Sequence, residues 1–510
     1  MLRLELKGVT KRFPGVVAND AIDLTVEAGE VHGLLGENGA GKSTLMNILY
    51  GLYRADEGQV LIDGQQVHFS DPGDAIAAGI GMVHQHFMLV PVFTVAENIL
   101  LGKEPIDRFR RFDRRAAHEE VERLAETFGL PVDPSAVVED LPVGLQQRVE
   151  ILKALSRDAR LLILDEPTAV LTPQEADGLF ASIRGFQAAG RSVIFISHKL
   201  REHRDIADRI TVLRRGRAVG TVDATAADPQ ELAQLMVGRP VDLVVDRSPA
   251  RPSEPVLTVE GLEVLAADGQ RLVDSVDLTV HRGEILAIAG VEGNGQTPLV
   301  EAITGLLPIG GGRVLLGEED LTGRSRKEIV RSGVGHIPED RTMHGLVGSF
   351  SVADNLVLNL WDDERFAARR TRRFDEVRSH ARRVVKDFDV RTPSIGTPAS
   401  SLSGGNQQKV IVAREFDRPI RVLVAAQPTR GVDVGSIEYI HRQLVAKRDA
   451  GVGVLLVSSE LDEVIALADR VAVMFRGRLI GPFPTPVAKE ALGLMMAGVP
   501  AEEAMRGLAA

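Results

Sequence analysis

Residues 36–44, Gly-Glu-Asn-Gly-Ala-Gly-Lys-Ser-Thr, decide the fold of this chain. They fill every diagnostic position of a phosphate-binding loop, a pattern in which a glycine is followed after four residues by Gly-Lys-Ser. The apolar run 31–35 predicts a buried strand before the loop, and residues 42–49 predict the helix after it. Because strand, loop and helix follow in the order that the motif requires, an ordinary glycine-rich turn is the weaker interpretation.

In such a loop the backbone N–H groups surround the β- and γ-phosphates, and the helix N-terminus adds positive potential. Lys42 is expected to neutralise phosphate oxygens, and the Ser43 hydroxyl is expected to ligate Mg²⁺. The predicted phosphate contacts are Gly36, Glu37, Asn38, Gly39, Ala40, Gly41, Lys42, Ser43 and Thr44.

The composition limits the classes of function. The chain has 510 residues, 44% of them hydrophobic, with a net charge of −11 and no cysteine. This length predicts roughly two to four domains, and the acidic balance disfavours a protein that binds nucleic acid through a broad basic face. Disulfides and thiolate metal sites are excluded, as expected for a reducing compartment. No apolar run reaches the roughly 18 residues of a membrane span, so we expect another protein to recruit this chain to any membrane.

The second half of the sequence repeats the first. Gly36 pairs with Gly290 (290 − 36 = 254), and Gly144 pairs with Gly405 (405 − 144 = 261). The second copy therefore carries seven more residues (261 − 254 = 7) between two blocks of constant register. A register that changes in one place only indicates two duplicated domains.

The variable, mostly helical parts of the copies are residues 86–140 and 340–401. A stretch rich in proline predicts an extended linker at residues 241–255, between a first domain, 1–240, and a second, 256–510. Because apolar strands alternate with helices in each copy, the expected fold class is α/β with a mainly parallel sheet.

Two strand ends of the first copy carry polar side chains. Asp165 and Glu166 follow the apolar residues 161–164, which predicts a buried strand that delivers both acids to a ligand-binding sheet edge. We expect Asp165 to hold Mg²⁺ and Glu166 to orient or deprotonate the attacking water; two ordinary surface acids are the alternative. His198 ends another apolar strand, where it could contact the γ-phosphate or be merely structural. Gln85, a further candidate for the metal or the γ-phosphate, is uninformative alone.

With these motifs in this order, the sequence resembles the ATP-binding subunits of ABC transporters over essentially its whole length. The resemblance implies two tandem P-loop ATPase domains, each with a RecA-like parallel core, a small antiparallel β subdomain and a helical subdomain. It implies that ATP and Mg²⁺ are bound and that Phe13 stacks on adenine, with core packing as its alternative. It also implies that the signature segment of one domain caps the γ-phosphate of nucleotide held by the other. The signature residues assigned in this way are Ser403, Gly404 and Gly405.

The resemblance implies two composite sites, each formed by the phosphate loop of one domain and the signature of the other. The departures from the family pattern fall almost entirely in one of these two sites. The first site combines Lys42, Asp165, Glu166 and His198 with Ser403, Gly404 and Gly405, and it is intact. The second combines Gln296, Ala426, Gln427 and Ser459 with Pro142, Val143 and Leu145, and most of its groups are lost. Random decay would not divide in this way, so we predict one hydrolysing site, with Lys42, Glu166 and His198 as catalytic groups, and one site that binds nucleotide weakly or statically.

A fused pair with a degenerate second half resembles the importers of simple sugars and nucleosides, and residues 141–150 and 425–435 resemble the nucleoside branch. The resemblance implies two permease subunits as partners, an extracytoplasmic solute-binding protein as an indirect one, and a peripheral location on the cytoplasmic face of the membrane. Neither nucleic acid nor the solute is expected to bind. Residues 87–93 are apolar and could receive a permease helix or simply pack in the core. A soluble tandem ATPase that acts on ribosomes or DNA is the main alternative.

Overall fold

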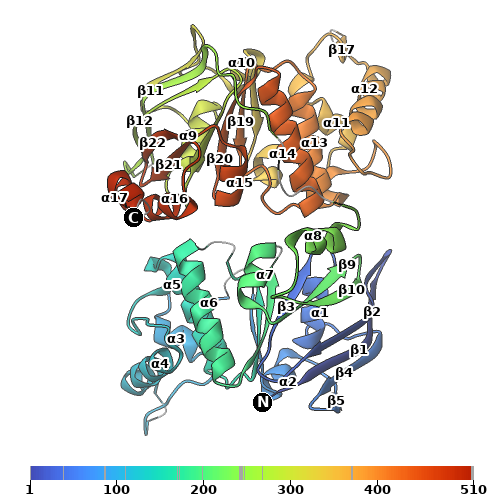
Figure 1. The fold of residues 1–510 in the computed structure, drawn as a ribbon, viewed down its shortest axis with the longest axis vertical. Coiled ribbons are helices and arrows are strands. Elements are labelled where there is room, and N and C mark those ends of the chain that lie inside the picture. The colour runs from blue at the N-terminus through green and yellow to red at the C-terminus, as the bar shows by residue number, and fades with distance from the viewer. Residues whose placement is uncertain are drawn as a thin grey trace. The chain divides into compact units, whose positions relative to one another are not determined.

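The chain forms two compact units, Met1–Val241 and Asp242–Ala510, in the computed structural model (Figure 1). The structure describes residues 2–37, 39–84, 88–109, 111–168, 171, 173–197, 199–240, 245, 247–266, 268–368 and 371–506. Each unit is an α/β domain built on a mainly parallel sheet, which confirms the fold class expected from the sequence.

The core sheet of the first unit has the strand order β10-β9-β3-β8-β7-β6, parallel except for β10. Its strands are β3 (Val31–Gly36), β6 (Ile80–Val83), β7 (Leu161–Asp165), β8 (Ser192–Ser197), β9 (Arg209–Arg214) and β10 (Arg217–Asp223). Every residue of β3, β7 and β8 is buried, as expected for central parallel strands covered on both faces.

A smaller antiparallel sheet, ordered β2-β1-β4-β5, packs on one face of the core sheet. Its strands are β1 (Leu4–Phe13), β2 (Val16–Val26), β4 (Glu57–Ile62) and β5 (Gln65–Val67). Leu4, Leu6 and Leu24 point inward from alternating positions and share a core with Leu34 of β3 and Leu45.

The helices of the first unit are α1 (Lys42–Leu49), α2 (Pro72–Ala77), α3 (Val95–Ile99), α4 (Arg114–Phe128), α5 (Val143–Leu155), α6 (Pro173–Ala188), α7 (Leu200–Ile206) and α8 (Pro229–Val237). Side chains of Asp71, Thr94, Asp113 and Asp228 accept backbone N–H groups at the starts of α2, α3, α4 and α8. The strand 31–35 and the helix 42–49 expected around the phosphate loop are confirmed as β3 and α1.

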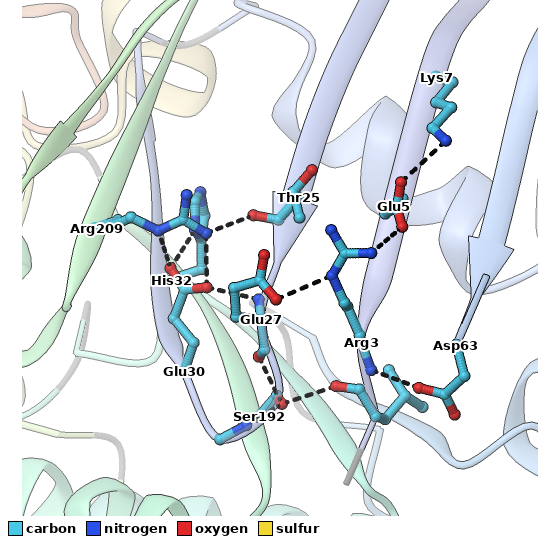
Figure 2. Close-up of polar contacts among 12 residues, drawn as sticks. Arg3, Glu5, Lys7, Thr25, Glu27, Glu30, His32, Asp63, Ser192 and Arg209 are labelled. Carbon is cyan, nitrogen blue, oxygen red and sulfur yellow. Dashed lines mark hydrogen bonds and ion pairs between the residues drawn. The ribbon is translucent and has the colours of Figure 1, made fainter.

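An ionic group around the buried Glu30 joins β2, β3 and β9 of the first unit (Figure 2). Arg209 donates to both oxygens of Glu30 (2.8 Å each) and to the Thr25 carbonyl (3.0 Å), while His32 contacts the same carboxylate at 2.9 Å. Burial opposes the charge of Glu30, but the bonds from His32, Arg209 and the Glu27 amide lower its pKa to about 2. The group therefore ties the end of the small sheet to the core sheet through an ionised glutamate.

The second unit has the same topology, with a core sheet ordered β16-β19-β20-β13-β21-β22 and a small sheet ordered β12-β11-β14-β15. The core strands are β13 (Ile285–Ala289), β16 (Val334–Ile337), β19 (Val422–Ala426), β20 (Gly453–Ser458), β21 (Arg470–Phe475) and β22 (Arg478–Pro484). The small sheet contains β11 (Pro255–Leu265), β12 (Arg271–His281), β14 (Gly311–Leu316) and β15 (Glu319–Asp320), and β17 (Ala367–Ala368) pairs with β18 (Thr371–Arg372). Arg470 and Glu284 repeat the pair Arg209 and Glu30.

The helices of the second unit are α9 (Gln296–Ile303), α10 (Arg326–Arg331), α11 (Val352–Leu356), α12 (Phe374–Asp387), α13 (Gly404–Phe416), α14 (Val434–Asp449), α15 (Leu461–Leu467), α16 (Lys489–Met496) and α17 (Ala501–Arg506). A short π-helix, η2 (Arg341–Gly345), follows β16. Helices α11 and α12 lie in the segment 340–401, and α3 and α4 lie in the segment 86–140. These are the variable parts that the sequence predicted to be mostly helical.

Candidate functional site

The phosphate loop of the first unit joins β3 to α1 in the conformation that its glycines allow. Gly41 has a φ of +101°, and a Cβ there would lie 2.3 Å from the Ala18 carbonyl oxygen, so only glycine fits. The Lys42 ammonium turns back over the loop and donates to the carbonyl oxygens of Gly36 (2.6 Å) and Glu37 (3.0 Å). These carbonyls hold the ammonium at the loop that the motif assigns to phosphate.

Lys42 is 6% exposed, and burial lowers its pKa despite the opposing charges of Glu166, Asp165 and Glu37. A phosphate would supply the negative charge that a buried ammonium lacks. Ser43 and Thr44 occupy the first turn of α1, exposed and half-buried respectively. Gly39 is exposed and Ala40 is buried, while Asn38 lies outside the described residues.

The two acids lie at the C-terminal end of β7, one on the strand and one directly after it. Burial and the charge of Glu166 raise the pKa of Asp165 to about 6, against the opposing effect of Lys42. Glu166 has a φ of +48°, a backbone conformation that costs energy for a residue other than glycine, and its N–H donates to the Ile196 carbonyl at 2.9 Å. Gln427, its counterpart (427 − 166 = 261), has a φ of +46°. The strained turn is thus a property of both copies.

Phe13 ends β1 with 37% of its surface exposed. Its ring meets the edge of Tyr53 at a centroid distance of 5.4 Å, and the Lys11 ammonium lies 5.6 Å from the ring centre. An exposed aromatic of this kind can stack on a planar base. Gln85 and His198 lie outside the described residues, as does Ala267, where the second unit lacks the aromatic.

The segments 141–145 and 402–406 begin equivalent helices. Ser403 is the N-cap of α13, as Pro142 is of α5, and its hydroxyl accepts a hydrogen bond from Asn406 at 2.9 Å. A Cβ on Gly405 would lie 2.4 Å from an Asp433 carboxylate oxygen, and one on Gly404 would lie 2.9 Å from the Arg341 guanidinium. These glycines therefore let the N-terminus of α13 pack closely on its neighbours. Proline provides neither a hydroxyl nor an N–H at the first helix.

The phosphate loop of the second unit keeps the glycine conformation of the first, with a φ of +108° at Gly295, but it carries a neutral side chain at the lysine position. Gln296 occupies the lysine position, is 7% exposed, and donates its amide to the Val291 carbonyl at 3.0 Å. The Gln427 side chain accepts the Ser459 N–H at 3.1 Å. A cavity of about 10 Å³ remains between the loop and the end of β19, lined by Glu292, Gln296, Thr297, Val300, Glu339, Ala426, Gln427 and Val457. This volume holds about one water molecule.

Arg430 joins the phosphate loop of the second unit to the segment that follows β16. Arg430 pairs with Glu292 of the loop at 2.5 Å and with Glu339 after β16 at 2.6 Å, and the Thr297 hydroxyl donates to Glu339 at 2.7 Å. Burial raises the pKa of Glu292, and the Glu339 charge adds to this, while Arg430 counteracts it. Thr297 and Glu339 are the counterparts of Ser43 (297 − 254 = 43) and Gln85 (339 − 254 = 85). Their side chains bond to each other, and the Glu339 carboxylate is also paired with Arg430.

A family model described as ABC transporter matches residues 19–169 and 273–430. The chain belongs to the ABC transporter family. The guanosine import ATP-binding protein NupO of Bacillus subtilis is 48% identical over 98% of this chain and 98% of its own length. The nucleoside import ATP-binding protein NupA of Lactococcus lactis is 47% identical over 97% and 98%, and the glucose import ATP-binding protein TsgD13 of Haloferax volcanii is 47% identical over 97% and 96%.

A solved structure of an archaeal ribosome recycling factor, in complex with a ribosomal stalk protein, aligns with 94% of this ABC ATPase and 90% of its own chain. The TM-score is 0.62 at 18% identity, which shows a shared fold alone. In the part of the chain that the structure describes, no helix combines the length and apolarity needed to cross a bilayer.

Sequence reasoning about this ABC ATPase missed two charged residues. Arg430 stands where the first copy has Ala169 (430 − 261 = 169), so subtraction of the repeat could have singled it out. Glu202 has a matching glutamate in the second copy, Glu463 (463 − 261 = 202), and therefore gave no signal of difference. Only the hydrogen bonds of Glu202 distinguish the two.

Proposed function

We propose that this chain is the ATP-hydrolysing subunit of an importer for nucleosides. The observation that carries the proposal is the contrast between the two phosphate loops. The first presents a buried lysine beside Asp165 and Glu166, whereas the second presents Gln296 with Arg430 bound to two glutamates. The identity of 48% with a guanosine importer subunit over 98% of the chain supports the same assignment.

In the proposed hydrolytic site, the loop residues 36–44 and Lys42 bind the phosphates of ATP, and Phe13 stacks on adenine. Ser43 and Asp165, together with Gln85, offer oxygen ligands that suit Mg²⁺, which when bound neutralises phosphate charge. Glu166 orients or deprotonates the attacking water, and His198 contacts the γ-phosphate. Ser403, Gly404 and Gly405 of the second unit supply the signature that completes this site.

The second site is proposed to be catalytically inert. It lacks the lysine, both acids and the histidine, and Pro142 removes two hydrogen-bond donors from its signature. The two domains of this asymmetric pair are residues 1–240 and 256–510, joined by a linker at 241–255.

The proposed partners are two permease subunits, with a solute-binding protein acting on them from outside, and the proposed location is the cytoplasmic face of the membrane. The apolar residues after β6 offer a docking surface: Met88 is 62% and Val92 is 68% exposed, while Leu89 packs on the core. We expect neither nucleic acid nor the solute to bind this subunit.

Simple sugars are the second candidate solute, because a glucose import protein is 47% identical to this chain. The segments 141–150 and 425–435 favour the nucleoside branch. Uptake of labelled nucleosides, pentoses and hexoses by a deletion strain, with and without the restored gene, decides between them. Restored uptake of a nucleoside is the expected result. Restoration of sugar uptake alone would assign the chain to a sugar importer. Recovery of the chain only with ribosomes or DNA would contradict a role in import.

A further inference from the structure

Glu202 of α7 connects the two strand ends that carry the proposed catalytic groups. Its carboxylate accepts the Thr168 hydroxyl at 2.6 Å and the Ser197 hydroxyl at 2.7 Å. Thr168 follows Glu166 by two residues, and Ser197 directly precedes His198. One carboxylate therefore spans the ends of the neighbouring parallel strands β7 and β8.

The three groups are shielded from water. Thr168 is 4% and Ser197 is 2% exposed, and the Glu202 side chain is 13% exposed. Hydroxyl-to-carboxylate bonds of 2.6–2.7 Å are short and charge-assisted, a class of hydrogen bond stronger than neutral ones. We call the two hydrogen bonds of Glu202 to Thr168 and Ser197 the bridge. Two further hydrogen bonds hold the residues at its ends: the Lys199 N–H donates to the Ser197 hydroxyl at 3.0 Å, and the Gln147 amide donates to the Pro167 carbonyl.

The second unit has the same glutamate but only half of the bridge. Glu463 accepts the Thr429 hydroxyl at 2.8 Å and His441 at 2.9 Å through a single oxygen, Oε1. Its other oxygen is buried and has no hydrogen-bond partner within the described residues. The Ser458 hydroxyl, the counterpart of Ser197 (458 − 261 = 197), accepts the Glu460 N–H at 3.1 Å. The bridge between strand ends is thus complete in the unit with both acids and incomplete in the unit that lacks them.

We propose that Glu202 is a positioning residue for ATP hydrolysis, fixing the spacing between Glu166 and His198 through Thr168 and Ser197. This inference rests on the proposed roles of Glu166 and His198. It requires no contact between Glu202 and the nucleotide. Reacting groups that shift by about 1 Å can lose about 100-fold in rate, so a side chain that fixes two strand ends can control turnover without contributing to ATP binding.

The test compares Glu202→Ala with the matched variant Glu463→Ala in the full chain assembled with its permeases. Glu202→Ala is expected to lower kcat about 10- to 100-fold while the KM for ATP and the affinity for a fluorescent ATP analogue change less than about 3-fold. Glu463→Ala is expected to keep kcat, because its unit carries no acid pair. Equal losses of kcat in both variants, or a loss of affinity in place of kcat, would overturn the proposal.

A second pair of variants separates positioning from folding. Thr168→Val removes the hydroxyl at nearly constant volume and is expected to lower kcat at an unchanged thermal midpoint, whereas Thr168→Ser keeps the hydroxyl and is expected to recover most of the rate. If kcat falls only in variants whose thermal midpoint also falls, the loss reflects stability, and a positioning role is contradicted. If Glu166→Gln turns over ATP at close to the wild-type rate, the proposed function fails as well. If Glu166→Gln loses at least about 100-fold and Glu202→Ala is not impaired, the positioning role alone fails.

Discussion

At the level of single residues, the two phosphate loops share a backbone conformation but carry side chains of different charge. Lys42 and Gln296 both turn back to carbonyl oxygens of their own loops. Lys42 keeps a positive charge near two acids, whereas Gln296 is neutral and the nearby guanidinium, Arg430, is already paired with Glu292 and Glu339. The difference between the sites therefore lies in side-chain charge.

Removal of the proposed base tests the assignment of the reacting groups. Glu166→Gln is expected to lower ATP turnover by about 10²- to 10⁴-fold, the usual contribution of a general base, with ATP still bound. Phosphate release measures the effect. Gln427→Ala, at the matching turn of the second unit, is the control and should retain turnover; comparable loss there would contradict a single hydrolytic site.

The lysine position provides a second comparison. Lys42→Ala removes a charge-assisted bond to phosphate worth about 1.5–3 kcal/mol, so we expect weak nucleotide binding and no transport. Gln296→Ala should change both far less. Equilibrium dialysis with labelled ATP is expected to give about one tight site per chain in the wild type. Two equal sites, or a large effect of Gln296→Ala, would be inconsistent with the asymmetry.

At the level of secondary-structure elements, the second unit contains a buried ionic cluster around Glu415, and the first unit has no acid at the matching position. Glu415 of α13 accepts bonds from Arg414 (3.2 Å), Arg418 (2.7 Å) and Asn359 (2.6 Å). Arg326 of α10 contacts His336 of β16 at 3.1 Å. In the first unit the positions of Glu415 and His336 hold the apolar residues Ala154 (415 − 261 = 154) and Met82 (336 − 254 = 82), so the buried acid and its histidine neighbour are absent there.

This cluster predicts that the second unit is sensitive to acid. Burial opposes the charge of Glu415, but Arg418 and Arg414 lower its pKa to about 2, and burial with the charge of Arg326 lowers the pKa of His336 to about 3. Both folded-state values lie below the unfolded ones, so the stabilisation present at neutral pH declines below pH about 6.5 for His336 and about 4.5 for Glu415. It is lost as the pH falls through the folded values. Arg414 and His344 of η2 also lower the pKa of His336, while Glu415 raises it.

The measurement is calorimetry of the full chain between pH 7 and pH 3. Glu415→Gln is expected to destabilise the second unit by about 3–5 kcal/mol at neutral pH, as for a broken buried ion pair, and to flatten its decline below pH 4.5. Glu376→Gln, at an exposed position of α12, is the control. An unchanged acid profile in the Glu415 variant would assign the acid sensitivity to other groups.

For the whole molecule, the two units share a topology, while only the first carries the lysine, the two acids and the histidine that we propose to act in hydrolysis. We expect the chain to copurify with two permeases in the membrane fraction. Met88→Ser should reduce this association, because Met88 is exposed in the segment that follows β6 in the sequence, while nucleotide binding by the detergent-free chain persists. Immunoblotting of membrane fractions and ATP binding are the two readouts. Loss of nucleotide binding together with association would point to misfolding instead of docking.

The sequence by itself determined the elements and the repeat of this protein, because they depend on local patterns: the apolar run before the loop, the spacing of Gly36, Gly41 and Lys42, and the constant offset between copies. It also identified the family and the candidate residues of the first site. The tertiary structure alone decided which charged side chains meet. Arg430 reaches Glu292 and Glu339 across more than 90 residues of chain (430 − 339 = 91), and Glu202 gathers hydroxyls from two strand ends. Such contacts depend on the packing of distant segments, and no local pattern encodes them.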